Sequence, residues 1–171
     1  TKTDTSFTLA ANTVVSSDES KLVAPGTNGS MAEFSMTGKP EVAVRVSYDV
    51  KEFKLTNWTT DGNDEYCPLV FTVNGTEYKI GNAGIANVAQ LQTAVKNAIN
   101  AYTKDYEANQ DLSGKTADNL QVSWAWAFED TTVGAYQTDA KDTALGNRAA
   151  ANVANAGKID FAVTMTVTQI D

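Results

Sequence analysis

Apolar and polar residues alternate along three parts of this chain. The alternating segments are residues 42–50, 120–128 and 159–167. A period of two places every second side chain on one face, so each segment is predicted to be a strand with one buried face. After residue 50 the phase changes, because the next apolar residues, Phe53 and Leu55, have the other parity. A one-residue shift of this kind predicts a β-bulge near Lys51 or Glu52.

Turn-forming residues separate further strand-like runs. Asn74-Gly75 lies in the middle of residues 69–80, between two short apolar runs. Asn and Gly both tolerate positive φ, so this dipeptide favours a two-residue hairpin turn. Shorter strands are predicted at residues 7–11, 14–15 and 31–36.

One segment has the periodicity of a helix. Apolar residues recur at steps of three and four at Val88, Leu91, Val95, Ala98 or Ile99, Tyr102 and Tyr106. This spacing predicts an amphipathic helix over residues 88–106. Asn87 followed by Gln90 resembles a capping box at its start. A second, Ala-rich helix is predicted over residues 142–155, before Gly157.

Together these elements predict a mainly β fold. Each alternating strand has one apolar face, which another layer must cover. We therefore expect one domain over residues 1–171. It would be an antiparallel two-sheet jelly-roll sandwich, with one or two helices inserted in long connections.

The composition excludes several classes of function. The chain has 171 residues with 13 basic and 21 acidic side chains, a net charge of −8, and no histidine. Nucleic acid is not expected as a partner, because affinity for phosphate backbones comes from Lys and Arg. Without histidine there is no Ser-His-Asp triad and no His-containing zinc site, so we expect no enzyme activity. No apolar run approaches the roughly 18 residues of a transmembrane helix, so we expect no membrane insertion.

Carboxylates and one thiol remain as candidate ligands. Asp61, Asp64 and Glu65 lie in a segment that resembles part of a calcium loop but lacks its full ligand spacing. They are weak calcium candidates, a solvated turn is the alternative, and no other cofactor is expected. Asp142 near the second helix is interpreted as a residue that favours the helix dipole. Cys67, the only cysteine, is interpreted as apolar filler.

The three tryptophans are candidates for a binding surface. Trp124 and Trp126 share one face of a predicted strand, where a place in the core is favoured over a stacking platform for sugar rings. Trp58 lies among polar residues, where an exposed ring with a ligand-binding role is possible. An exposed ring would suit the alternative function, a monomeric carbohydrate-binding or adhesive β-sandwich module.

Six segments, taken together, form a pattern seen in a known family. They are residues 22–30, Gly38, and residues 41–48, 122–129, 142–147 and 159–169. These segments resemble TasA/camelysin-type secreted biofilm-matrix proteins of spore-forming Gram-positive bacteria. The resemblance covers most of the chain.

The resemblance implies a structural protein. It implies an extracellular jelly-roll subunit that polymerises into biofilm or cell-surface fibres and whose leader is removed on export. Camelysin has been described as a metalloprotease, but this chain has no histidine and no HExxH motif, so that activity is not carried over. We expect a secreted chain whose main partner is itself, in a homopolymer. Other matrix proteins or cell-wall components are further candidate partners.

The resemblance also implies how the subunits join. Family fibres form by self-assembly through donor-strand exchange, in which an amino-terminal strand enters a groove of the next subunit and satisfies its backbone groups. The candidate donor is residues 1–12, and one face of it carries Thr3, Thr5, Phe7, Leu9 and Ala11. The alternative is that this segment is the subunit's own first strand. Head-to-tail donation is a heterologous contact that does not close, so it gives a filament.

Overall fold

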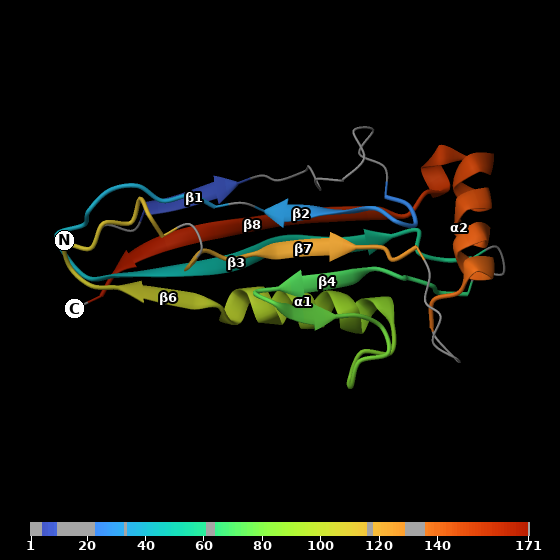
Figure 1. Ribbon diagram of the computed structural model, residues 1–171, viewed down its shortest axis with the longest axis horizontal. Coiled ribbons are helices and arrows are strands. Elements are labelled where there is room, and N and C mark those ends of the chain that lie inside the picture. The colour runs from blue at the N-terminus through green and yellow to red at the C-terminus, as the bar shows by residue number, and fades with distance from the viewer. Residues whose placement is uncertain are drawn as a thin grey trace.

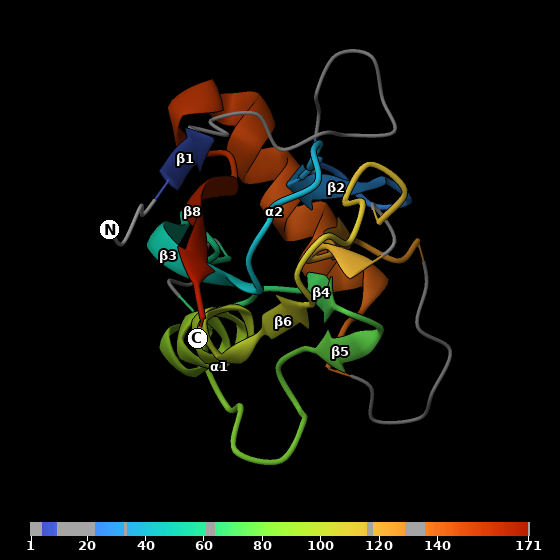
Figure 2. The ribbon, with the colours of Figure 1, turned by 90° about the vertical axis from the view of Figure 1, so that its left-hand side faces the viewer.

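The strands of the computed structural model form two antiparallel sheets that lie face to face (Figure 1, Figure 2). The structure describes residues 5–9, 23–32, 34–60, 64–115, 118–128 and 136–170. Sheet A has the strand order β1-β8-β3-β6, and sheet B has the order β2-β7-β4-β5. The strands are β1 Thr5–Leu9, β2 Asn28–Ala32, β3 Val44–Thr56, β4 Val70–Val73, β5 Thr76–Tyr78, β6 Thr103–Tyr106, β7 Val122–Ala125 and β8 Lys158–Gln169. The predicted mainly β sandwich of two antiparallel sheets is therefore confirmed.

Two helices lie in connections between strands, as predicted. Helix α1, Val88–Ala101, follows β5 and lies along β3, whereas α2, Asp139–Ala151, crosses one end of the sandwich (Figure 1). A short 3-10 helix, η2 Val153–Asn155, links α2 to β8. The predicted start of α1 is confirmed, since Asn87 is its N-cap and the Asn87 Oδ1 accepts the N–H of Gln90 at 2.8 Å.

The long strand β3 confirms the predicted bulge. β3 pairs with β8 from Val44 to Thr56, and the register shifts between Val50 and Glu52. Lys51 is therefore the extra residue. Val50 before the bulge and Leu55 after it are both buried. The bulge thus keeps apolar side chains on the core face across the change of phase.

The predicted hairpin is β4–β5. Its turn residues Asn74 and Gly75 have φ angles of 47° and 83°, the positive values that a two-residue hairpin turn requires. The Asn74 Oδ1 also accepts the N–H of Gln121 at 2.9 Å. This bond ties the turn to the segment that leads into β7.

The first predicted helix was too long. α1 ends at Ala101, Tyr102 is its C-cap, and residues 103–106 form β6. The apolar period continued past the helix because Tyr106 is buried, although from a strand. A residue in a strand just after a helix can face the core at a position that also continues the three- and four-residue spacing of the helix.

Other boundaries also differ from the predictions. The second helix lies earlier than residues 142–155, because Thr138 caps it and it begins at Asp139. The strand predicted over residues 120–128 contains only the four residues of β7, and Phe128 is 70 % exposed. Strands predicted at residues 7–11 and 31–36 lie slightly earlier, as β1 and β2. The strand predicted at residues 14–15 lies outside the described residues.

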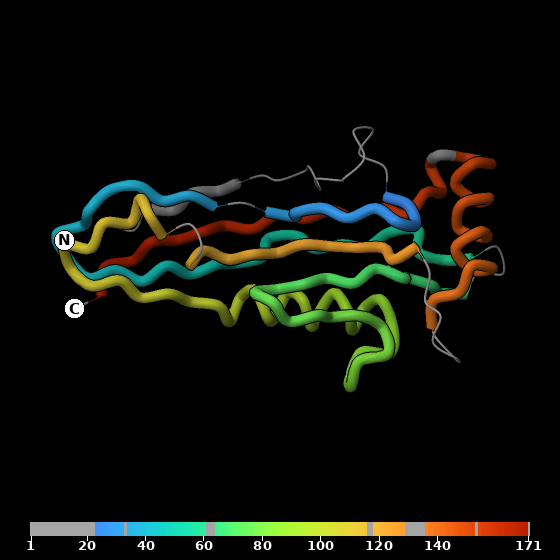
Figure 3. Tube along the Cα trace, in the orientation of Figure 1, coloured from blue at the N-terminus to red at the C-terminus, as the bar shows by residue number. Residues whose placement is uncertain are grey.

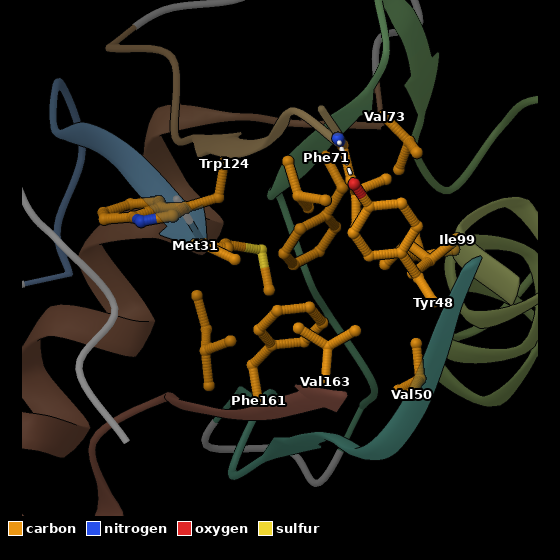
Figure 4. Close-up of a cluster of buried hydrophobic side chains, with 14 of the residues drawn as sticks. Met31, Tyr48, Val50, Phe71, Val73, Ile99, Trp124, Phe161 and Val163 are labelled. Atoms are coloured by element: carbon orange, nitrogen blue, oxygen red, sulfur yellow. Dashed lines mark hydrogen bonds between the residues drawn. The ribbon is translucent and has the colours of Figure 1, made fainter. Parts of the chain in front are cut away.

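Both sheets and α1 contribute to one core between the layers. In Figure 4 the labelled side chains from the two sheets point toward one another, with a helical residue beside them: Met31, Phe71, Val73 and Trp124 of sheet B, Tyr48, Val50, Phe161 and Val163 of sheet A, and Ile99 of α1. Burying each such aliphatic side chain contributes about 1.5–3 kcal/mol. The backbone N–H of Leu120 donates to the Tyr48 Oη at 3.1 Å inside this cluster.

One continuous segment covers the outer edge of β3. β6 pairs with β3 from Val44 to Ser47. Farther along β3, polar side chains of α1 bind the edge: the Asn100 Oδ1 accepts the N–H of Val50 at 2.8 Å, and the Gln92 Oε1 accepts the N–H of Leu55 at 2.7 Å. Figure 3 shows the chain running directly from α1 into β6 along this edge.

Candidate functional site

The first described strand occupies one edge of sheet A. β1 has a single neighbour in the sheet, β8, and the two strands are antiparallel. The register sets alternate residues of β1 opposite alternate residues of β8: Thr5 opposite Val167, Phe7 opposite Met165 and Leu9 opposite Val163. Directly opposite positions in an antiparallel pair share one face. The register therefore pairs these three positions with residues of β8 that are buried in the core or packed against it.

Three of the five candidate donor residues therefore lie at one sheet edge. Thr5, Phe7 and Leu9 belong to β1, whereas Thr3 and Ala11 lie outside the described residues. In this single chain β1 pairs with β8 of the same chain. This arrangement is the alternative in which the segment is the subunit's own first strand, and it also identifies the edge that a donated strand would occupy.

β8 does not depend on β1 for its place in the sheet. On its other side β8 pairs with β3 from Lys158 to Gln169. Its inward-facing residues Phe161, Val163 and Met165 are buried in the core. An incoming strand would thus meet an ordered edge, with its backbone groups already aligned by β3.

The other described sheet edges are less suited to strand addition. The register between β2 and β7 is irregular between Ser30 and Ala32, and β5 has only three residues. Irregular and short edge strands disfavour pairing with another chain. β6, the edge strand on the other side of sheet A, has only four residues, and beyond it polar side chains of α1 bind the outer edge of β3. The β1 edge of sheet A is therefore the candidate functional site.

The acidic calcium candidates are only partly described. Asp61 lies outside the described residues, and Asp64 is exposed. The Glu65 Oε1 accepts the N–H of Val88 at 2.8 Å, so this carboxylate binds the first turn of α1. No cluster of three or more metal-ligating side chains occurs among the described residues. Calcium binding by this segment stays a prediction.

The structure contradicts the exposed ring that the polar neighbours of Trp58 made possible. The Trp58 side chain is 3 % exposed, and its Nε1 donates to the carbonyl of Lys158 at 3.1 Å. The ring packs edge-on against Trp126, with 5.6 Å between centroids, and Gly157 lies directly against it. No face of Trp58 is free for a sugar ring. The neighbours that bury it are distant in sequence, which is why local composition was misleading.

Trp124 and Trp126 lie in the core, as favoured from the sequence. Both are buried. Trp126 contacts Trp58, and Trp124 faces the central cluster (Figure 4). Neither ring offers a stacking platform.

A buried polar cluster that the sequence did not reveal attaches α2 to the sandwich. The Tyr66 Oη donates to the Asp142 Oδ1 at 2.6 Å and accepts the N–H of Thr138 at 3.3 Å. The Gln137 Nε2 donates to the Asp142 Oδ2 at 3.0 Å. Burial first, and then the Asp142 carboxylate, raise the pKa of Tyr66 well above its ordinary value. Asp142 lies in the first turn of α2, where an acidic residue favours the helix dipole, and its carboxylate is also buried and hydrogen-bonded.

Cys67 is buried beside this cluster, in agreement with its interpretation as filler. Its backbone N–H donates to the Tyr136 Oη at 3.0 Å. Burial raises the pKa of the Cys67 thiol to about 12. The thiolate is therefore scarcely populated at neutral pH, and the residue behaves as a small apolar group.

Comparisons with known proteins do not place the chain in a family. No family model, no curated protein and no solved structure matches it. Within the part of the chain that is described, no helix is long and apolar enough to cross a membrane.

Proposed function

We propose that this chain is a structural subunit that polymerises head-to-tail, with the amino-terminal strand of one copy pairing with β8 of the next. The observation that carries the proposal is the position of β1. It comes first in the described chain, lies at a sheet edge, has one neighbour, and is in register with core-facing residues of β8. An identical strand from another copy would satisfy the same backbone groups of β8, so exchange requires no new interface chemistry.

The length of chain after β1 is compatible with exchange. Residues 10–22 connect Leu9 to Val23 in the sequence. About 13 residues in extended form span up to roughly 45 Å, which is enough to reach an adjacent domain. The contact is heterologous, because the donor edge and the acceptor edge are different surfaces, and repetition therefore gives a filament.

We also propose that the sandwich is a jelly roll. Its support is the nested pairing of the strands: β1 with β8, β2 with β7, β3 with β6, and β4 with β5. Rolling up one long hairpin produces this order, and the two sheets then contain alternate parts of the same hairpin.

The setting of the polymer is proposed from the resemblance to TasA/camelysin-type proteins. That resemblance is the basis for secretion, for a place in the biofilm matrix or on the cell surface, and for the absence of catalysis. The net charge of −8 is compatible with it, since like charge on the outer surfaces keeps long fibres soluble. The alternative of a carbohydrate-binding module has less support, because Trp58, its candidate aromatic, is buried.

The proposal is tested by deleting residues 1–11 and examining the purified chains by negative-stain electron microscopy at acidic and neutral pH. Lowering the negative charge should promote association of the full chain. We expect thin filaments with a fixed repeat from the full chain. The deleted chain should remain folded, because β8 keeps its pairing with β3, and should form no filaments. Filaments from the deleted chain would refute donation by this segment.

A peptide added in trans distinguishes two reasons why the deleted chain would form no filaments: loss of the pairing strand and a general loss of solubility. A synthetic peptide of residues 1–11 should bind the open edge of β8 and raise the melting temperature of the deleted chain. It should not restore filaments, since a free peptide carries no second subunit. The matched control is the same peptide with Phe7→Asp and Leu9→Asp. Equal stabilisation by both peptides would show that the register seen for β1 is not used.

A further inference from the structure

We propose that α1 is an edge guard: the side chains of Asn100 and Gln92 block strand addition at the outer edge of β3, so that each subunit accepts a strand at one edge only. The inference deepens the proposed function and rests on it for its biological meaning. Protection of the β3 edge can be measured in single copies of the chain. In the fibre, closure of this edge would prevent branching, because each subunit would accept only one strand.

The guard acts on the backbone groups that strand addition uses. A strand joining an antiparallel sheet must accept the outward N–H groups of the edge strand. Beyond Ser47, where β6 ends its pairing, the Val50 N–H donates to Asn100 and the Leu55 N–H donates to Gln92, at 2.8 and 2.7 Å. Both donors are therefore occupied by side-chain carbonyl oxygens, at normal hydrogen-bond lengths.

The bulge at Lys51 is what makes both bonds possible. In a regular strand, N–H groups five residues apart point to opposite edges, because the orientation alternates with a period of two. The extra residue between Val50 and Glu52 shifts the phase, so the N–H groups of Val50 and Leu55 point to the same edge. The bulge thus presents two donors to one helix.

The helix has the matching spacing. Gln92 and Asn100 are eight residues apart, which corresponds to about 12 Å of helix. The strand from Val50 to Leu55 covers roughly 13 Å when the bulged residue adds little length. Gln92 binds the later residue of β3 and Asn100 the earlier one, so α1 runs antiparallel to the strand that it covers.

The guard helix is anchored in the core. α1 inserts four apolar residues into the core: Val88, Leu91, Val95 and Ile99. Its chain continues into β6, which pairs with the same edge. β1, in contrast, has a single strand neighbour. Beyond β6, the outer edge of β3 is therefore closed by a packed helix, whereas the opposite edge of the sheet is formed by β1, the strand that we propose is exchanged.

The test compares Gln92→Ala, Asn100→Ala and their double variant with Lys96→Ala. Lys96 lies between the two guard residues on α1 and is exposed. Alanine favours the helix at all three positions, so α1 itself is not weakened. In dilute solution, where the double variant is present as single copies, the amide protons of Val50 and Leu55 should exchange about two- to tenfold faster than in the unsubstituted chain. Lys96→Ala should leave both rates unchanged. Unchanged exchange rates in the double variant would overturn the proposal.

The second readout is association of the full chain through β3. At a concentration where the parent and Lys96→Ala sediment as single copies, the double variant should form larger species in sedimentation velocity. In those species the Val50 and Leu55 amides should regain protection, because a strand of a second copy now accepts them. Faster amide exchange without such association would also overturn the proposal. If the parent chain forms no filaments, the proposed function fails, while the exchange rates still decide whether the edge is guarded.

Discussion

Replacing Gly157 by Ala should destabilise the fold through a single steric overlap. Gly157 immediately precedes β8 and lies against the indole of Trp58. A Cβ at this position would be 2.9 Å from the Trp58 Cη2, 2.9 Å from Cζ2 and 3.0 Å from Cε2. Favourable carbon–carbon contacts occur at about 3.5–4.0 Å, so the new methyl group would be too close to three ring atoms by roughly 0.5 Å or more.

The ring cannot easily move away. Its Nε1 donates a hydrogen bond to the Lys158 carbonyl, and the ring is in a T-shaped contact with Trp126. Inserting a carbon into such a packed site costs about 1–3 kcal/mol. Alanine also lowers the conformational entropy of the unfolded chain, which offsets about 0.4–1 kcal/mol of this cost. The net loss in the free energy of unfolding should be about 1–2 kcal/mol, a fall of roughly 2–8 °C in melting temperature for a domain of this size.

Urea denaturation followed by tryptophan fluorescence measures this loss, and Gly146→Ala is the matched control. Gly146 lies inside α2, and a Cβ there meets nothing within 4 Å. The same substitution should therefore stabilise the chain there by about 0.5–1 kcal/mol. A second background, Trp58→Phe, lacks the overlapping ring atoms and should make Gly157→Ala close to neutral. A neutral or stabilising Gly157→Ala in the parent chain would refute the packing of Trp58 described above.

Two further substitutions test other contacts of the sandwich. Tyr66→Phe removes one of the two hydrogen-bond donors to the buried Asp142 carboxylate and should cost about 1–3 kcal/mol in urea unfolding. Because folding raises the pKa of Tyr66 above its ordinary value of 10.0, the unfolded chain loses that proton first, and stability should fall as pH rises above about 10. Urea titrations between pH 8 and 11 should show a shallower fall for Tyr66→Phe, and an equal fall would exclude this linkage. Glu65→Ala should cost about 0.5–1 kcal/mol and speed amide exchange at Val88, whereas Asp64→Ala should leave that rate unchanged.

Local signals were sufficient for much of the sandwich. The change of phase between Val50 and Phe53 was enough to predict the bulge, because an apolar face must stay on one side of a sheet. The Asn74-Gly75 turn and the Asn87 cap were also visible, since each depends on residues within a few positions. These features are decided by backbone preferences and by the period of the apolar residues.

Contacts between distant residues were not visible from the sequence. Trp58 is surrounded in sequence by polar residues, yet residues about 100 positions later bury it. The bond between Tyr66 and Asp142 joins residues 76 positions apart, and no local pattern marks either partner. The candidate site shows the same division. Alternation predicted an amino-terminal strand, but only the fold shows that β8 is its neighbour.

The nested order of the strand pairs also has a kinetic consequence. The β4–β5 hairpin closes a two-residue loop, and each pair outside it joins segments that the previous pair has already brought closer. Because closing a loop costs more entropy as the loop grows, we expect pairing to proceed outward from this hairpin. β1 and β8, at opposite ends of the chain, would then pair last. A newly folding subunit would pass through an interval in which β8 is ordered and still unpaired on one side. During that interval a neighbour's strand competes with its own, and local subunit concentration decides which one binds.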